Sequence, residues 1–124
     1  MILGIGTDII EIARMERSLS KGEAFKRLVF ASEEISYCEA QGNSKASYAG
    51  RFAAKEAFLK ALGTGWVGEM KLSDIVVLNN DEGKPYFNLK NEVKNEAESR
   101  GDISIHLSIS HSEIHATAVV IIEK

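Results

Sequence analysis

The sequence predicts a single α+β domain spanning residues 1–124, in which a mainly antiparallel sheet packs against a long central helix. Residues 50–65 are rich in helix-forming residues and end in Gly-Thr-Gly. Residues 2–9 and 103–110 alternate along their length, as strands do. The predicted order is a strand, several helices, two strands, a helix and two strands, and this order favours an antiparallel sheet.

The first predicted strand, residues 2–9, has one nearly bare face, because Gly4 and Gly6 precede Asp8 on it. Paired glycines let another backbone or a ligand approach closely. Asp8 then either ends a core strand beside a close neighbour or caps the helix that follows. The other face carries Leu3, Ile5, Thr7 and Ile9.

Two short helices are predicted next, at residues 9–19 and about 22–29. The stretch 11–27 holds five basic and three acidic residues in a chain of net charge −3. Mixed charges are usually a solvated face, but a modest basic patch can also receive an acidic partner. The basic residues are Arg14, Arg17, Lys21, Lys26 and Arg27.

Ser32 is predicted to cap a helix that reaches about residue 40, and the long helix follows from about residue 45 to 62. Gly63 suits a left-handed C-cap. Glu56 and Lys60 lie side by side on this helix. They either form an i, i+4 ion pair, worth roughly 0.3–0.5 kcal/mol on a solvated face, or serve a function.

The second half of the chain predicts two hairpins around one helix. The elements are strands at 73–78 and 86–89, a helix at 89–100, and strands at 103–110 and 116–122. The first hairpin turns through Gly83-Lys84-Pro85. His111 lies at the tip of the second, where it is either solvated or functional.

Composition excludes several classes of protein and site. The net charge argues against general nucleic-acid binding, and no apolar run is long enough for a membrane span. The N-terminus lacks a basic leader, so a cytoplasmic location is expected. Cys38 is the only cysteine, which excludes an internal disulfide and a cysteine-rich zinc site; it is expected to be a buried structural thiol.

Motif searches find no nucleophile elbow, phosphate loop or zinc helix. Asp8 and Glu56 remain as two carboxylates that could share a hard cation, and magnesium takes one or two such ligands. Arg51, Lys55 and Lys60 lie on the same helix as Glu56 and would neutralise charge on a phosphate leaving group. These residues suit phosphoryl-type transfer.

Three blocks of sequence carry a resemblance to a known family. They are Gly4-Ile5-Gly6-Thr7-Asp8-Ile9, the stretch from Arg51-Phe52-Ala53-Ala54-Lys55-Glu56-Ala57 through Lys60-Ala61 to Gly63-Thr64-Gly65, and Ser108-Ile109-Ser110-His111 followed by Ala116-Thr117-Ala118. With the Gly83-Lys84-Pro85 turn and the total length, the chain resembles the holo-acyl-carrier-protein synthases, small trimeric phosphopantetheinyl transferases. The resemblance implies the 4′-phosphopantetheinyl transferase fold.

It also implies an activity: transfer of the 4′-phosphopantetheine arm of coenzyme A to a serine of apo acyl carrier protein, with release of adenosine 3′,5′-bisphosphate, in fatty acid biosynthesis. Mg²⁺ is the implied cofactor. Asp8 and Glu56 would hold the cation, and Asp8 or a metal-held water would take the serine proton. Lys60 would stabilise or protonate the departing phosphate.

The resemblance further implies a homotrimer with sites between subunits. Carrier-protein binding would fall to Arg14, Arg17, Lys21, Lys26 and Arg27. Coenzyme A binding would fall to Arg51, Lys60, Gly63, Gly65, Lys84, Pro85, Ser110 and His111. Two other readings stay open: a metal-dependent hydrolase that uses water as the acceptor, and a non-catalytic domain that only binds an acyl carrier protein.

Overall fold

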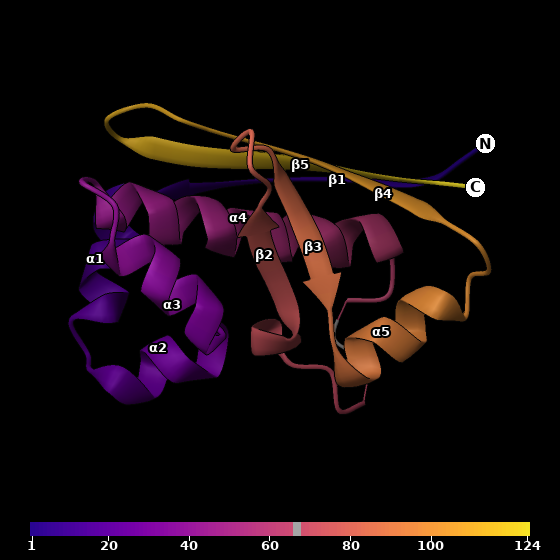
Figure 1. Cartoon of the computed structure of the whole chain (residues 1–124), viewed down its shortest axis with the longest axis horizontal. Coiled ribbons are helices and arrows are strands. Elements are labelled where there is room, and N and C mark those ends of the chain that lie inside the picture. Colours follow the sequence, from indigo (N-terminus) through magenta and orange to yellow (C-terminus); the bar gives the residue numbers. More distant parts are fainter. Residues whose placement is uncertain (66–67) are drawn as a thin grey trace.

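The computed structural model describes residues 1–65 and 68–124 and has the predicted α+β architecture (Figure 1). A three-stranded antiparallel sheet of order β1-β5-β4 lies on one side of the long helix α4, and a two-stranded hairpin, β2-β3, crosses the helix. Helices α1 to α3 gather at one end of the molecule and α5 lies at the other.

The helices are α1 (Ile12–Leu19), α2 (Glu23–Val29), α3 (Ser32–Glu39), α4 (Ser44–Leu62) and α5 (Asn91–Glu98). The strands are β1 (Ile2–Glu11), β2 (Ile75–Asn79), β3 (Pro85–Leu89), β4 (Ser104–His111) and β5 (His115–Glu123). A short 3-10 turn, Leu72–Asp74, precedes β2. Gly63 ends α4 in the left-handed conformation, as predicted.

The bare face of β1 packs directly on α4. A Cβ atom at Gly4 would lie 1.9 Å from the carbonyl oxygen of Ala61, and one at Gly6 would lie 1.9 Å from that of Ala57. No side chain fits at either position, so the two glycines bring the strand and helix backbones together. The predicted close neighbour of this strand is therefore α4.

Several predicted boundaries differ from the observed ones, and two of these differences have a clear physical cause. The first helix begins at Ile12 rather than at residue 9, because β1 continues its pairing with β5 as far as Glu11, opposite His115. Ile9 therefore stays in the strand and is 63% exposed. Ser32 does not cap α3; it is the first helical residue, and the Glu34 carboxylate accepts a hydrogen bond from the Ala31 N–H instead.

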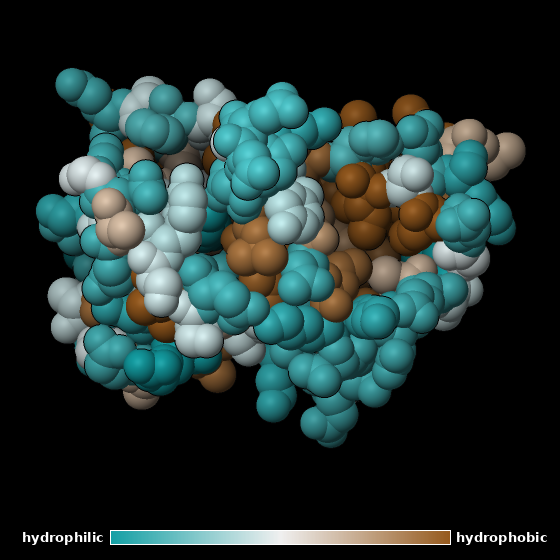
Figure 2. Space-filling model, in the orientation of Figure 1, coloured by the Kyte–Doolittle hydropathy of each residue, from teal (hydrophilic) through white to brown (hydrophobic). Residues whose placement is uncertain are grey.

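Nearly the whole circumference of α4 is buried, between the sheet on one side and β2 and α3 on the other. Cys38 is buried too, as expected, and burial raises the pKa of its thiol. Figure 2 shows apolar side chains gathered in a hollow toward the α5 end, where Phe87, Leu89 and Ile103 help to line a cavity of about 380 Å³. Within the described ranges, no helix is long and apolar enough to cross a membrane.

Candidate active site

Asp8 from β1 and Lys60 from α4 meet where the strand packs along the helix. The Lys60 ammonium donates to Asp8 Oδ1 at 3.1 Å and to the carbonyl oxygen of Thr7 at 3.0 Å. Asp8 lies four residues before α1 begins and contacts Lys60, so the structure favours the close neighbour over the helix cap. The alternative of a Glu56–Lys60 ion pair is replaced by this contact with Asp8.

Glu56 lies near Asp8, in a place that disfavours its charge. Burial raises the pKa of the Glu56 carboxyl, the negative charge of Asp8 raises it further, and Lys60 partly offsets both effects. Asp8 and Glu56 line one cavity of about 370 Å³, together with Arg14, Phe25 and Phe52. We call Asp8, Glu56 and Lys60 the carboxylate site.

The chemistry of this site fits a divalent cation. Two carboxylates that repel each other in a half-buried cavity are stabilised by a shared positive charge, and oxygen is the ligand that magnesium prefers. No cluster of three or more metal-binding side chains occurs in residues 1–65 and 68–124, and magnesium needs only one or two carboxylates when substrate oxygens and water complete its shell.

The loop after α4 adjoins the carboxylate site. Gly63 and Gly65 line a shallow cavity of about 310 Å³ with Glu56, Leu59 and Lys60. Both glycines have positive φ, +79° and +62°, and this conformation carries the chain sharply away from the helix end. Their backbone is thus exposed beside Lys60, open to a ligand.

Arg51 lies in a different cavity of about 310 Å³, which we call the arginine cavity. Gly83, Pro85 and His111 contribute to its wall, while Lys84 and Ser110 are exposed next to it in sequence. The Arg51 side chain is 5% exposed, and its Nη2 donates to Asn79 Oδ1 at 2.5 Å. The Tyr37 ring stacks on the guanidinium, 4.1 Å from its centroid to the Arg51 Cζ.

The predicted coenzyme-binding residues therefore fall into two groups. Arg51 and Glu56 are five residues apart on α4, which places them about 140° apart around the helix axis. Arg51 lines the arginine cavity, whereas Glu56 lines the two cavities at the carboxylate site. The first group is Asp8, Glu56, Lys60, Gly63 and Gly65, and the second is Arg51, Lys84, Pro85, Ser110 and His111.

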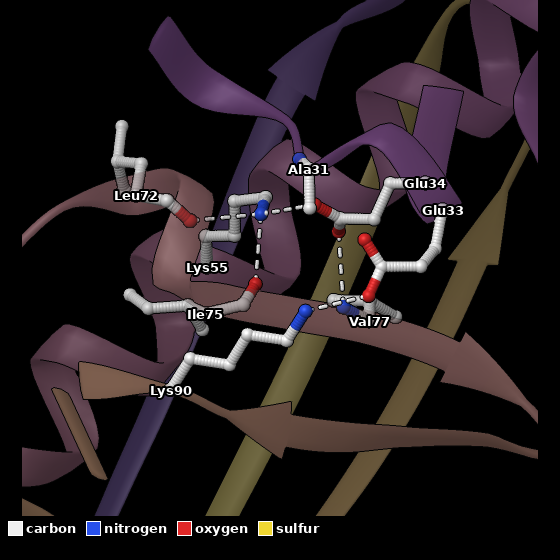
Figure 3. Close-up of polar contacts among 8 residues, drawn as sticks. All are labelled: Ala31, Glu33, Glu34, Lys55, Leu72, Ile75, Val77 and Lys90. Atoms are coloured by element: carbon white, nitrogen blue, oxygen red, sulfur yellow. Dashed lines mark hydrogen bonds and ion pairs between the residues drawn. The ribbon is translucent and has the colours of Figure 1, made fainter. Parts of the chain in front are cut away.

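The expectation that Lys55 joins Arg51 and Lys60 at a phosphate is wrong. Its ammonium is fully buried and donates to Glu34 Oε1 at 2.7 Å and to the carbonyl oxygens of Leu72 and Ile75 (Figure 3). Glu34 in turn accepts from the Val77 N–H at 2.9 Å. Burial lowers the pKa of Lys55, and the Glu34 charge opposes this. Lys55 ties α4 to α3 and β2.

The five residues of the basic patch also differ in their surroundings. Arg14 lines the cavity of the carboxylate site, and Arg17, Lys21 and Arg27 are exposed. Lys26 is turned inward: its side chain is 15% exposed, and its ammonium lies 3.5 Å from Glu39. Four of the five predicted carrier-binding residues are thus free to meet a partner, and Lys26 braces α2 against α3.

Some residues of both cavities escaped the sequence analysis. Asn79 and Tyr37 contact Arg51, and Phe25 and Phe52 line the wall beside Asp8 and Glu56. Asn79 reads in the sequence only as turn chemistry, since its partner lies 28 residues away. An aromatic residue on a helix reads first as core. Nothing local distinguishes these residues.

The chain is similar to known proteins of one family. Residues 4–119 match the model of the 4′-phosphopantetheinyl transferase superfamily. Among curated relatives, the holo-acyl-carrier-protein synthase of Clostridium tetani is 48% identical over 99% of this chain and 97% of its own length.

Solved structures agree with this relationship. The holo-acyl-carrier-protein synthase of Neisseria meningitidis is 39% identical, with a TM-score of 0.91 and full coverage of both chains. The Bacillus anthracis synthase, solved in complex with coenzyme A (3′,5′-ADP), is 40% identical, with a TM-score of 0.80, and covers 98% of this chain and 96% of its own.

Proposed function

The chain belongs to the 4′-phosphopantetheinyl transferase superfamily as a holo-acyl-carrier-protein synthase, and from this premise we propose its reaction. It transfers the 4′-phosphopantetheine arm of coenzyme A to a serine of apo acyl carrier protein and releases adenosine 3′,5′-bisphosphate. The reaction serves fatty acid biosynthesis in the cytoplasm. Coenzyme A in the Bacillus anthracis structure, a 40% identical relative, supports the choice of donor.

The observation that carries this proposal is the meeting of Asp8, Glu56 and Lys60 where β1 packs along α4. The serine oxygen attacks the phosphorus next to the pantetheine arm, and the bond from that phosphorus to the pyrophosphate bridging oxygen breaks. Asp8, or a water that the cation would hold beside it, takes the serine proton. Lys60, whose side chain is 55% exposed beside Asp8, offsets the charge that grows on the departing phosphate.

Mg²⁺ is the proposed cofactor, held by Asp8 and Glu56. The raised pKa of Glu56 beside a second carboxylate supports this, because a bound cation relieves their repulsion. The ion would supply Lewis-acid stabilisation of the pyrophosphate oxygens. The protein's own contribution is to hold two oxygen ligands on a rigid strand and a rigid helix.

The partner that accepts the arm is an acyl carrier protein, and the exposed basic side chains of α1 and α2 are proposed to bind it. Arg14 supports this assignment best, since it lines the cavity of the carboxylate site and can guide an acidic partner to it. Arg17, Lys21 and Arg27 extend the basic surface away from the cavity. Lys26 contributes indirectly, because its contact with Glu39 holds α2 against α3.

A homotrimer with sites between subunits would bring the two groups of coenzyme-binding residues together. The outer face of the three-stranded sheet supports this, because Leu3, Ile5, Ile9 and Val119 are 40–65% exposed on it and no other described element covers them. Exposed apolar patches of this kind mark interaction surfaces. In a closed ring, the carboxylate site of one copy faces a different surface of the next.

Intact mass spectrometry of the carrier tests the proposed reaction. With coenzyme A, Mg²⁺ and an apo acyl carrier protein, the carrier is expected to gain about 340 Da, the mass of the arm after pyrophosphate cleavage. A chelator should abolish the gain, and restored Mg²⁺ should recover it.

Two other outcomes would overturn the proposal. If coenzyme A is consumed while the carrier mass stays constant, the protein is a hydrolase; Arg17→Ala, which removes a basic charge outside the cavity of the carboxylate site, should then leave its rate unchanged. If neither coenzyme A nor carrier changes with several carrier proteins, and Glu56→Gln leaves carrier binding intact, the protein is a binding module.

A further inference from the structure

Arg51 is buried without a counter-charge. The residue is 5% exposed, and no salt bridge to it occurs among the described residues. Nη2 donates to Asn79 Oδ1 at 2.5 Å and Nη1 lies 3.5 Å from Ser47 Oγ, while Nε is buried without any partner. Buried cations are normally paired with an anion, and Arg51 has only neutral partners, so its guanidinium has the charge and the free N–H group to bind one.

Asn79 contacts two parts of the arginine cavity at once. Its Oδ1 accepts from Arg51 at 2.5 Å, and its Nδ2 donates to the carbonyl oxygen of Gly83 at 2.9 Å. These two contacts fix which end of the amide faces the arginine, because only the oxygen can accept. Asn79 thus ties Arg51 on α4 to the β2-β3 turn, which carries Lys84 and Pro85.

Asn79 contacts an edge of the guanidinium, whereas the Tyr37 ring of α3 lies on one of its faces, with its centroid 4.1 Å from the Arg51 Cζ. A flat stacked guanidinium has its N–H groups confined to one plane, pointing outward. Asn79 and Tyr37 therefore define both the position and the plane of Arg51. The asparagine does so without neutralising the positive charge, which an aspartate would do.

We infer that Asn79 is a positioning residue that holds the Arg51 guanidinium and the Gly83–Pro85 turn in one geometry for a phosphate of coenzyme A, with Tyr37 as the stacking support. This inference rests on the proposed function. It adds an amide whose role is to orient a cation and leave its charge available to the substrate.

Substitution at Asn79 separates this role from a merely structural one. Asn79→Ala removes the anchor, and KM for coenzyme A is expected to rise about tenfold, as for loss of one hydrogen bond to a charged group. KM for the carrier should stay within about twofold of wild type. Asn79→Asp keeps the acceptor but neutralises Arg51, so coenzyme A binding should weaken at least as much as in Asn79→Ala.

Matched controls come from the same elements. Asn88→Ala alters an exposed asparagine of β3 whose side chain makes no hydrogen bond within the described residues, and it should leave every parameter unchanged. Tyr37→Leu removes the π face and should weaken coenzyme A binding several-fold, and Tyr37→Phe, which restores the stacked ring, should recover most of that loss.

The experiment is steady-state transfer with each substrate varied in turn, and calorimetric titration of coenzyme A into the wild type, Asn79→Ala, Arg51→Met and the double variant. Asn79→Ala is expected to cost much less in the Arg51→Met background than alone. Equal costs in both backgrounds, or an unchanged KM for coenzyme A in Asn79→Ala, would overturn the inference. A wild type that does not transfer at all would instead contradict the proposed function. If Arg51→Met does not fold, Asn79→Asp tests the inference instead. Unchanged coenzyme A binding in that variant would also overturn it.

Discussion

Glu56 carries its charge at a cost to the folded protein. Burial and the neighbouring Asp8 raise the pKa of its carboxyl above the ordinary value of 4.5, so ionisation is harder in the folded chain than in the unfolded one. Above the folded-state pKa, the charged carboxylate therefore lowers the free energy of unfolding. Below pH 4.5, both states are protonated and the cost disappears.

The variant Glu56→Gln should reverse this cost. Without a divalent cation, its free energy of unfolding at pH 7 is expected to equal or exceed that of the wild type, and the difference should shrink to zero as the pH falls through the raised pKa toward 4.5. Transfer should fall at least 100-fold, because a neutral amide replaces the anionic carboxylate that would bind the cation. Thermal melting across this pH range measures the first effect.

A control variant and the effect of Mg²⁺ on the melting temperature complete this test. Glu92→Gln, on α5 away from both cavities, should change the free energy of unfolding by less than about 0.5 kcal/mol. Mg²⁺ should raise the melting temperature of the wild type but not that of Glu56→Gln. A metal-free Glu56→Gln that melts well below the wild type at pH 7 would contradict the assigned electrostatics.

The sequence predicted some single residues and not others for a clear reason. Lys55 and Glu56 are neighbours on one helix, yet Glu56 faces a cavity and Lys55 is buried against Glu34. Helical periodicity gives the angle between two side chains, but it does not show which residue of another element packs on each face of the helix. Glu34 lies 21 residues away, and no local pattern connects it to Lys55.

Among the elements, the contact between β1 and α4 sets the geometry of the carboxylate site. Gly6→Ala is expected to destabilise the protein by about 1–3 kcal/mol, because the new methyl group would lie 1.9 Å from the carbonyl oxygen of Ala57. The strand must then move away from the helix. Asp8 is two residues further along β1, so it should separate from Lys60 and transfer should fall as well.

Denaturant unfolding of Gly6→Ala beside Gly42→Ala measures this effect. A Cβ atom at Gly42 would meet no heavy atom within 4 Å, so that substitution should stay within about 0.5 kcal/mol of wild type. A Gly6→Ala protein as stable and active as the wild type would show that β1 can shift without consequence.

Most elements could be predicted from periodicity, but some of their ends could not. The alternation of β4 and the glycine stop of α4 are local signals, and both were confirmed. The end of β1 depends instead on its partner: Ile10 and Glu11 pair with Ala116 and His115, more than a hundred residues later. Strand pairing of this kind overrides a local helical pattern.

For the molecule as a whole, the fold class and the family could be predicted, whereas the division of the site could not. The sequence placed Arg51 and Glu56 in one functional stretch, and the structure places them on different faces of α4. This division is the reason to propose a homotrimer, since neighbouring copies can bring the two groups of predicted coenzyme-binding residues to one coenzyme. The exposed apolar face formed by Leu3, Ile5, Ile9 and Val119 is a surface on which copies can meet.

The central claim is that coenzyme A is held between the carboxylate site of one copy and the arginine cavity of the next while its arm passes to the carrier. Co-expression of Asp8→Asn and Arg51→Met chains tests it most directly, with carrier mass as the readout. Each variant alone should be nearly inactive. The co-expressed population should regain about a quarter of wild-type transfer, because about three quarters of randomly assembled trimers are mixed and one interface in three of each mixed trimer pairs an intact Asp8 with an intact Arg51. Mixed trimers no more active than the single variants would contradict the claim.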